Sequence, residues 1–111
     1  MELYELKKEQ ERVILVGIQT QETEDAQESL DELEELVKTA GAQAVGRVMQ
    51  TREAMHPGYY VGTGKVEEIK MAVRAFDATG IVCDDELTPS QMNNLERELE
   101  CKIMDRTMVI L

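Results

Sequence analysis

The strongest chemical signature in the sequence is the turn Gly62-Thr63-Gly64-Lys65, which leads into a predicted helix. Glycines let a backbone approach a phosphate closely, and the first N–H groups of a helix attract anions. A complete phosphate-binding loop needs the pattern G-x-x-x-x-G-K-[ST], but Tyr59 takes the place of its first glycine and Val66 follows the lysine. The pattern G-x-G-x-x-G is also incomplete, because residue 67 is Glu. The turn therefore favours a glycine connection between strand and helix over a self-sufficient nucleotide site.

A second candidate is the acidic turn Asp84-Asp85-Glu86, which follows the apolar run Ile81-Val82-Cys83. The carboxyl ends of buried strands often carry sites in α/β proteins, and carboxylates could hold Mg²⁺ there. Three adjacent side chains point in different directions, however, and the turn leads straight into a capped helix start at Thr88. The sequence therefore favours a loop and helix cap, and we predict no metal site.

The loop at Thr51–Gly58 contains the single histidine of the sequence, His56, and is predicted to be irregular or mobile. No Ser or Cys nucleophile in a recognisable motif accompanies His56, so we predict no catalytic residue. The following pair, Tyr59 and Tyr60, could stack on exposed RNA bases. The alternative, one ring packed inside and one at the surface, is favoured for such a pair.

Charge is distributed unevenly along the chain. The net charge of −11 argues against a free-standing nucleic-acid-binding module. Residues 20–36 hold eight acids and no base, which indicates a solvated helix face, whereas residues 37–74 hold six bases and three acids. Arg47, Arg52 and Lys65 flank the tyrosine-containing loop, so this basic middle is where a polyanion contact can be argued, although scattered surface bases are common.

Composition indicates an intracellular protein. Cys83 and Cys101 have no C-x-x-C spacing and no histidine cluster, so two reduced structural thiols are expected rather than a metal or redox site. The sequence has no apolar run of the roughly 20 residues that span a bilayer. Its first residues also lack the features of a signal peptide. We therefore expect a cytoplasmic location and no membrane partner.

Hydrophobic patterns predict strands that alternate with helices. The continuous apolar run at residues 13–18 is typical of a strand covered on both faces, as in a parallel sheet. Further strands are expected at residues 43–50, which alternate and so predict partial exposure, at residues 59–61 and at residues 81–83. The chain closes with two short apolar segments, residues 103–104 and 108–111. The second is either a last strand or the point where a longer chain was cut, and we favour the cut.

Three helices are expected between these strands. Their inward faces carry apolar residues at three- and four-residue spacing, from Ala26 to Ala40, from Val66 to Phe76 and from Met92 to Leu99. Gly41 is expected to end the first helix, and Thr88 with Gln91 forms a capping box that starts the third. The pattern predicts an α/β layered sandwich, a mostly parallel 4–5-stranded sheet with about three helices. Residues 1–11 are expected to form a polar tail and residues 12–111 a single domain.

Several short blocks, taken in order, resemble the N-terminal α/β domain of HflX-type ribosome-associated GTPases, over about residues 12–111. The blocks G-x-G-K, D-E-L-x-P-x-Q and D-R-T-x-x-I-L are weak alone and specific in combination. The matching segments are Ala40-Gly41-Ala42, Gln50-Thr51-Arg52, residues 60–68, residues 84–91, Asn94-Leu95-Glu96 and residues 105–111.

This resemblance implies a non-catalytic domain that helps a two-part protein dock on the large ribosomal subunit and its rRNA. GTP and Mg²⁺ would be cofactors of a separate GTPase domain, which together with a helical hairpin should follow residue 111. The family commonly has Arg before the Asn-Leu-Glu block, whereas this chain has Asn93, which removes one candidate phosphate contact. The candidate contact residues for RNA or for the GTPase domain are Arg47, Arg52, Tyr59, Tyr60, Gly62, Gly64, Lys65 and Arg106.

Two alternative functions stay open at this point. The acidic balance is compatible with an intramolecular regulator that restrains the attached GTPase domain. The Gly62–Lys65 and Asp84–Glu86 turns are also compatible with a small nucleotide-binding enzyme domain. Self-association through an exposed apolar terminal strand is also expected as a hazard.

Overall fold

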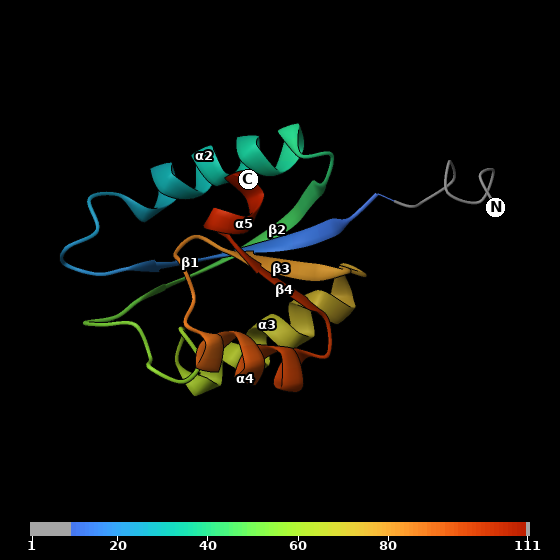
Figure 1. Ribbon diagram of the computed structural model, residues 1–111. Coiled ribbons are helices and arrows are strands. Elements are labelled where there is room, and N and C mark those ends of the chain that lie inside the picture. Colours follow the sequence, from blue (N-terminus) through green and yellow to red (C-terminus); the bar gives the residue numbers. More distant parts are fainter. Residues whose placement is uncertain (1–9, 111) are drawn as a thin grey trace, which may run out of the picture.

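The computed structural model describes residues 10–110 (Figure 1). The predicted polar tail therefore lies almost entirely outside the described residues. Strands and helices alternate along the rest of the chain. Their order is β1 (Arg12–Gln19), α2 (Ala26–Thr39), β2 (Gln43–Thr51), α3 (Thr63–Ala75), β3 (Gly80–Cys83), α4 (Pro89–Leu99), β4 (Lys102–Asp105) and α5 (Arg106–Ile110).

The four strands form one parallel sheet with the order β2-β1-β3-β4. Helices α2 and α5 lie on one face of the sheet, and α3 and α4 lie on the other (Figure 1). Each strand is joined to the next by a helix, as parallel neighbours require. The predicted α/β sandwich with a parallel sheet is confirmed, and α5 is an additional short helix.

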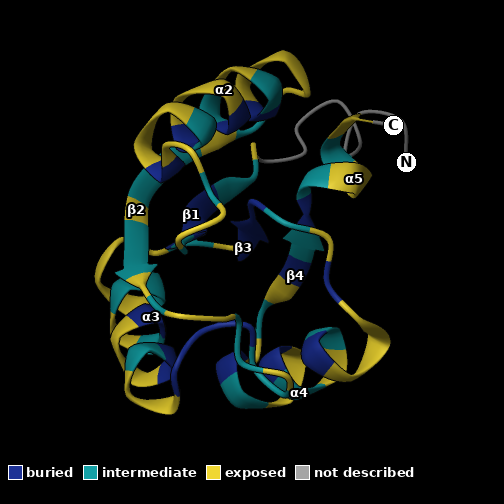
Figure 2. Cartoon of the chain, turned by 90° about the vertical axis from the view of Figure 1, so that its left-hand side faces the viewer, coloured by how far each residue is buried: buried dark blue, intermediate teal, exposed yellow. Residues whose placement is uncertain are grey.

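The central strand β1 is buried from Val13 to Ile18. Its side chains alternate between the two layers: Ile14, Val16 and Ile18 pack with α3 and α4, while Val13 and Leu15 pack with α2. Figure 2 shows this strand enclosed between the helices, whose outer surfaces are exposed. The continuous apolar run is therefore explained by cover on both faces, as the sequence predicted.

The helix ends follow the local signals in the sequence. In α2 the Asp25 carboxylate accepts hydrogen bonds from the N–H groups of Gln27 and Glu28, and Gly41 follows the helix with a left-handed φ of 93°. In α4 the predicted capping box is present: Thr88 accepts from the Gln91 N–H and the Gln91 side chain accepts from the Thr88 N–H.

Three sequence expectations are wrong. Tyr59-Tyr60-Val61 is not a strand: one bridge joins His56 to Tyr60, and the left-handed backbone of Tyr60 (φ 69°) turns the chain. Phe76 is 48% exposed because it sits at the C-terminal cap of α3, beyond the last buried turn. The terminal apolar residues 108–110 belong to helix α5 and do not form a last strand.

The junction between β4 and α5 depends on Asp105, which is buried. Its carboxylate accepts hydrogen bonds from the Leu87 N–H at 3.0 Å, the Thr107 hydroxyl at 2.5 Å and the Met108 N–H at 3.2 Å. Burial alone would raise the pKa of Asp105, but these bonds favour the charged form and lower its pKa overall. The residue thus caps α5 and fixes the loop that follows β3.

We expect Asp105→Asn to lower the free energy of unfolding at pH 7 by about 1–2 kcal/mol, because an amide cannot accept all three bonds. The native pKa lies below the unfolded value of about 3.9, so the ionised carboxylate stabilises the fold above that pH. This stability is lost as the pH falls through the native pKa. Urea titrations from pH 7 to pH 3 should show the gap between the two proteins narrowing below about pH 4.

The control for this prediction is Glu86→Gln, which removes an exposed acid from the same loop. Its unfolding free energy should stay within about 0.5 kcal/mol of the parent protein. A gap for Asp105→Asn that did not change between pH 7 and pH 3 would contradict the assigned role of the Asp105 charge.

Candidate functional site

The C-terminal edge of the sheet gathers the candidate residues. The chain leaves β1 over one face through α2 and leaves β2 over the other face through α3, so the direction of winding changes beside β1. Ligand sites of open α/β sheets lie at such a point, outside the carboxyl ends of the strands. Here the loops at residues 20–25, 52–62 and 84–88 meet that edge.

Helix α3 begins at this edge without a side-chain cap. Its N-cap residue is Gly62, whose own N–H donates to the Gln50 side-chain oxygen at 2.9 Å. Thr63 and Gly64 are exposed. The helices α2 and α4 have side-chain caps, whereas no side chain among residues 10–110 caps the first N–H groups of α3. Such groups attract anions.

Two basic side chains lie at this helix start. The Arg52 Nε donates to the Ala54 carbonyl at 2.9 Å, and a Cβ on Gly62 would come within 2.7 Å of the Arg52 Nη1. The guanidinium therefore packs directly on the Gly62 backbone. Lys65, in the first turn of α3, pairs with Glu68 at 2.6 Å. We call Arg52, Gly62, Gly64 and Lys65 the α3-start cluster.

The loop between β2 and α3 is irregular, as predicted, but it is anchored to α4. The His56 Nδ1 accepts from the N–H groups of Gly58 and Tyr59 at 2.9 and 3.1 Å, so His56 shapes the turn. From α4, Gln91 donates to the His56 carbonyl and Asn94 donates to the Gly58 carbonyl, each at 2.9 Å. These contacts fix the approach of the chain to the α3-start cluster.

Tyr60 is fully buried, so its ring cannot stack on an RNA base and it leaves the set of side-chain contact candidates. Its hydroxyl donates to the Asp85 carboxylate at 2.5 Å. Burial, with Cys83 and the nearby carboxylates, raises the pKa of Tyr60 well above its ordinary value. Tyr59 is half-buried at the surface, which matches the expected division of one ring inside and one outside.

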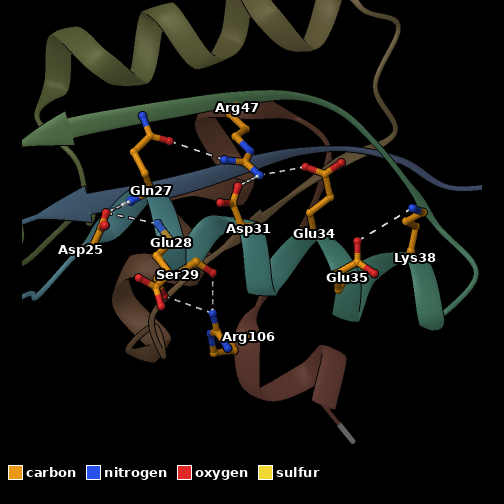
Figure 3. A network of polar contacts seen from close by, with 10 residues as sticks. All are labelled: Asp25, Gln27, Glu28, Ser29, Asp31, Glu34, Glu35, Lys38, Arg47 and Arg106. Carbon is orange, nitrogen blue, oxygen red and sulfur yellow. Dashed lines mark hydrogen bonds and ion pairs between the residues drawn. The ribbon is translucent and has the colours of Figure 1, made fainter.

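Arg47 and Arg106 lie apart from the α3-start cluster, on the α2 side of the sheet (Figure 3). Arg47 extends from β2 to two acids of α2, Asp31 at 2.6 Å and Glu34 at 2.9 Å. The hydrogen bond to Asp31 is the largest cause of its raised pKa. Arg106 pairs with Asp84 at 2.7 Å. Arg47 lies on β2, Arg52 follows that strand, and Lys65 and Arg106 lie on helices. The sequence could not separate these bases because their positions depend on how the elements pack.

The acidic turn after β3 is divided between two partners. Asp84 binds Arg106, whereas Asp85 accepts from Tyr60, and burial is the main cause of the raised pKa of Asp85. Within residues 10–110 no group of three His, Cys, Asp or Glu side chains is arranged to hold a metal ion. None of the helices over the same residues is long and apolar enough to cross a membrane.

Sequence reasoning missed two features of this region. Gln50, quoted only as part of a family block, holds the Gly62 N–H and so fixes the start of α3. An apolar hollow of about 490 Å³ between α2 and α5 was also missed, because its walls come together only in the fold. Its lining includes Leu36, Ala40, Met104, Met108 and Ile110.

The family described as GTP-binding GTPase N-terminal matches residues 27–111. The chain belongs to this family. GTPase HflX of Lacrimispora saccharolytica is 66% identical over 110 residues, covering 99% of this chain and 26% of that protein. GTPase HflX of Escherichia coli is 44% identical over 101 residues, covering 91% of this chain and 24% of that protein. The chain thus spans about a quarter of the length of these relatives, and its resemblance to the N-terminal domain of HflX-type GTPases is confirmed.

Solved structures of GTP-binding proteins agree with the architecture. A crystal structure of SsGBP in complex with GDP superposes with a TM-score of 0.62 at 16% identity, covering 88% of this chain and 27% of that one. A GTP-binding protein of Sulfolobus solfataricus in complex with GDP superposes with a TM-score of 0.60 at 17% identity, covering 88% and 29%. At these identities the likeness shows the fold alone.

Replacing each of the two glycines of the α3-start cluster by alanine should change the free energy of unfolding in opposite directions. A Cβ on Gly64 meets nothing within 4 Å, so Gly64→Ala should raise the free energy of unfolding by about 0.5–1 kcal/mol through lower chain entropy. Gly62→Ala should lower it by about 1 kcal/mol, because the new methyl displaces Arg52. Urea denaturation of the two variants measures both values.

The contact with Arg52 can be isolated with a double variant. In an Arg52→Ala background the penalty of Gly62→Ala should fall by at least half, since only Gln50, at 3.2 Å from the new Cβ, still crowds it. An undiminished penalty would show that Arg52 does not pack on Gly62.

Proposed function

We propose that this chain is the domain of an HflX-type GTPase that docks on RNA of the large ribosomal subunit in the cytoplasm, and that it does not hydrolyse GTP itself. The observation that carries the proposal is the α3-start cluster. An uncapped helix start, a guanidinium packed beside it and a lysine in the first helical turn lie together at this edge of the sheet. Together they form a surface with the donors that RNA phosphates require.

The charge of the rest of the chain limits this contact to a small area. Net charge is −11, and exposed acids cover α2 on the other face of the sheet. RNA is therefore repelled from most of the surface and attracted at the α3-start cluster. With Arg52 and Lys65 each neutralising one phosphate, the logarithm of affinity should fall with the logarithm of salt with a slope of roughly −2.

GTP and Mg²⁺ belong, in this proposal, to the larger part of the parent protein. The relatives named GTPase HflX are about four times longer than the matched region, which leaves room for a separate nucleotide-binding domain. The Gly62–Lys65 turn departs from the phosphate-binding pattern at its first glycine and after its lysine. We therefore assign this turn to docking.

Reversal of one charge tests the surface. Arg52→Glu should weaken co-sedimentation with purified large ribosomal subunits about tenfold at low salt, because a phosphate contact becomes a repulsion. The matched control is Lys38→Glu, which reverses an exposed base in the last turn of α2, away from the cluster. The control should bind as the parent chain does across the salt series.

Two outcomes would contradict the docking proposal. One is equal loss in Arg52→Glu and Lys38→Glu, which would indicate an effect of net charge alone. The other is unchanged binding in Arg52→Glu combined with Lys65→Glu, which would place the contact elsewhere.

A second candidate function, regulation of the attached GTPase domain, is favoured by α2. Its exposed acids Glu28 and Glu32 have no cationic partner in the described part of the chain. Such a face fits a basic surface of another domain.

If this chain regulates the GTPase domain, adding it in trans to an isolated HflX GTPase domain should change the rate of GTP hydrolysis at least twofold. Glu28→Lys with Glu32→Lys should abolish the effect, and an unchanged rate with the unaltered chain would exclude it.

A further inference from the structure

Asp84 and Asp85, at the end of β3, connect the two faces of the sheet. They follow the strand in a bend, and the alternation of Val82 and Cys83 between the two layers continues into them. Asp84 reaches Arg106 on the α2 side, whereas Asp85 receives the hydroxyl of Tyr60, which packs in the α3 and α4 layer. A single dipeptide therefore has one partner in each layer.

Arg106 holds three elements together on the α2 side. It is the first residue of α5, and its side chain donates to Asp84 Oδ1 through Nε at 2.8 Å. Its Nη2 also donates to the Ser29 carbonyl of α2 at 2.8 Å (Figure 3). The side chain of Asp84 is 7% exposed, so withdrawal of Arg106 would leave a nearly buried carboxylate without its counter-charge.

Tyr60 is the element on the other side that can change state. It has a left-handed backbone, which is unfavourable for a residue with a bulky side chain and persists only where neighbouring contacts impose it. Those contacts are the hydroxyl bond to Asp85 and two backbone bonds with His56, at 2.8 and 3.1 Å. Gly62, two residues later, begins α3, so the backbone of Tyr60 sets how the chain enters the α3-start cluster.

We propose that the Arg106–Asp84 ion pair holds the α3-start cluster in its docking conformation. A displacement of α5 that withdraws Arg106 is transmitted through Asp84 and Asp85 to Tyr60 and loosens the cluster. The inference rests on the proposed function for what the cluster binds, whereas the coupling itself rests on the contacts above. In this proposal the position of α5, on one side of the sheet, controls docking by the α3-start cluster on the other side.

The transmission is electrostatic. The pKa of Asp85 is raised chiefly by burial; the Tyr60 hydrogen bond lowers it, Asp84 raises it and Arg106 lowers it. Without Arg106, the charge of Asp84 stands uncompensated beside Asp85 and favours the protonated form of that carboxyl. The carboxylate that accepts the Tyr60 hydroxyl is then repelled by its neighbour, so this hydrogen bond weakens and the left-handed backbone loses a support.

Amide hydrogen exchange of the free chain, without ribosomes, tests this coupling. In Arg106→Gln the bonded amides of Tyr60, Gly62 and Val66 should exchange about tenfold faster, while those of β1 stay unchanged. The matched control is Lys102→Gln, which breaks the 3.2 Å pair with Glu11 at the other end of β4. The control should leave the three amides at the parent rate.

Two further variants make the result decisive. Asp84→Asn with Arg106→Gln removes both charges, so the three amides should return to within about threefold of the parent rate. Tyr60→Phe lacks the hydroxyl and should accelerate the same amides without disturbing α5, which keeps the test available if Arg106→Gln does not fold. Parent rates at all three amides in Arg106→Gln or in Tyr60→Phe, or equal acceleration in β1, would overturn the proposal. Because no ribosome is present, this result is separate from success or failure of docking.

Discussion

Burial of β1 on both faces is the constraint on which the rest of the structure depends. A strand with no solvated face needs a helix layer above and below and a strand on each side. Parallel pairing with β2 and β3 then requires crossovers, and these supply α2 to one layer and α3 to the other. As a result the loops after β1, β2 and β3 all open at one edge, where the α3-start cluster lies.

Polar groups at that edge are distributed so that each buried charge has a specific partner. Asp84 binds Arg106 and Asp85 binds Tyr60. Asp105 accepts from the Leu87 N–H of the loop after β3 and from two donors of the turn that follows it. Groups that are paired in this way stabilise loops and are not free to act on a ligand. The donors left open at the start of α3 differ in kind, since no side chain of the described residues caps that helix.

Local signals were enough to predict most of the fold, whereas contacts between layers were not. The Gly41 helix end, the Thr88 capping box and the buried run of β1 depend on neighbours in sequence, and all three are confirmed. Tyr60 was misjudged because its left-handed backbone is imposed by His56 and Asp85, which no local pattern reveals. Arg47 was grouped with Arg52 for the same reason, because only pairing of β2 with β1 decides which layer it faces.

The strand order also has a consequence for folding during synthesis. β1 is made first, and it can pair with β2 once a short loop and α2 have formed. Its other neighbour, β3, is joined to it only across α2, β2 and α3, so that pairing closes a much longer loop and forms later. Until then one edge of the most apolar strand stays open. The centre of the sheet is therefore completed late, although its main strand is synthesised before the other three described strands.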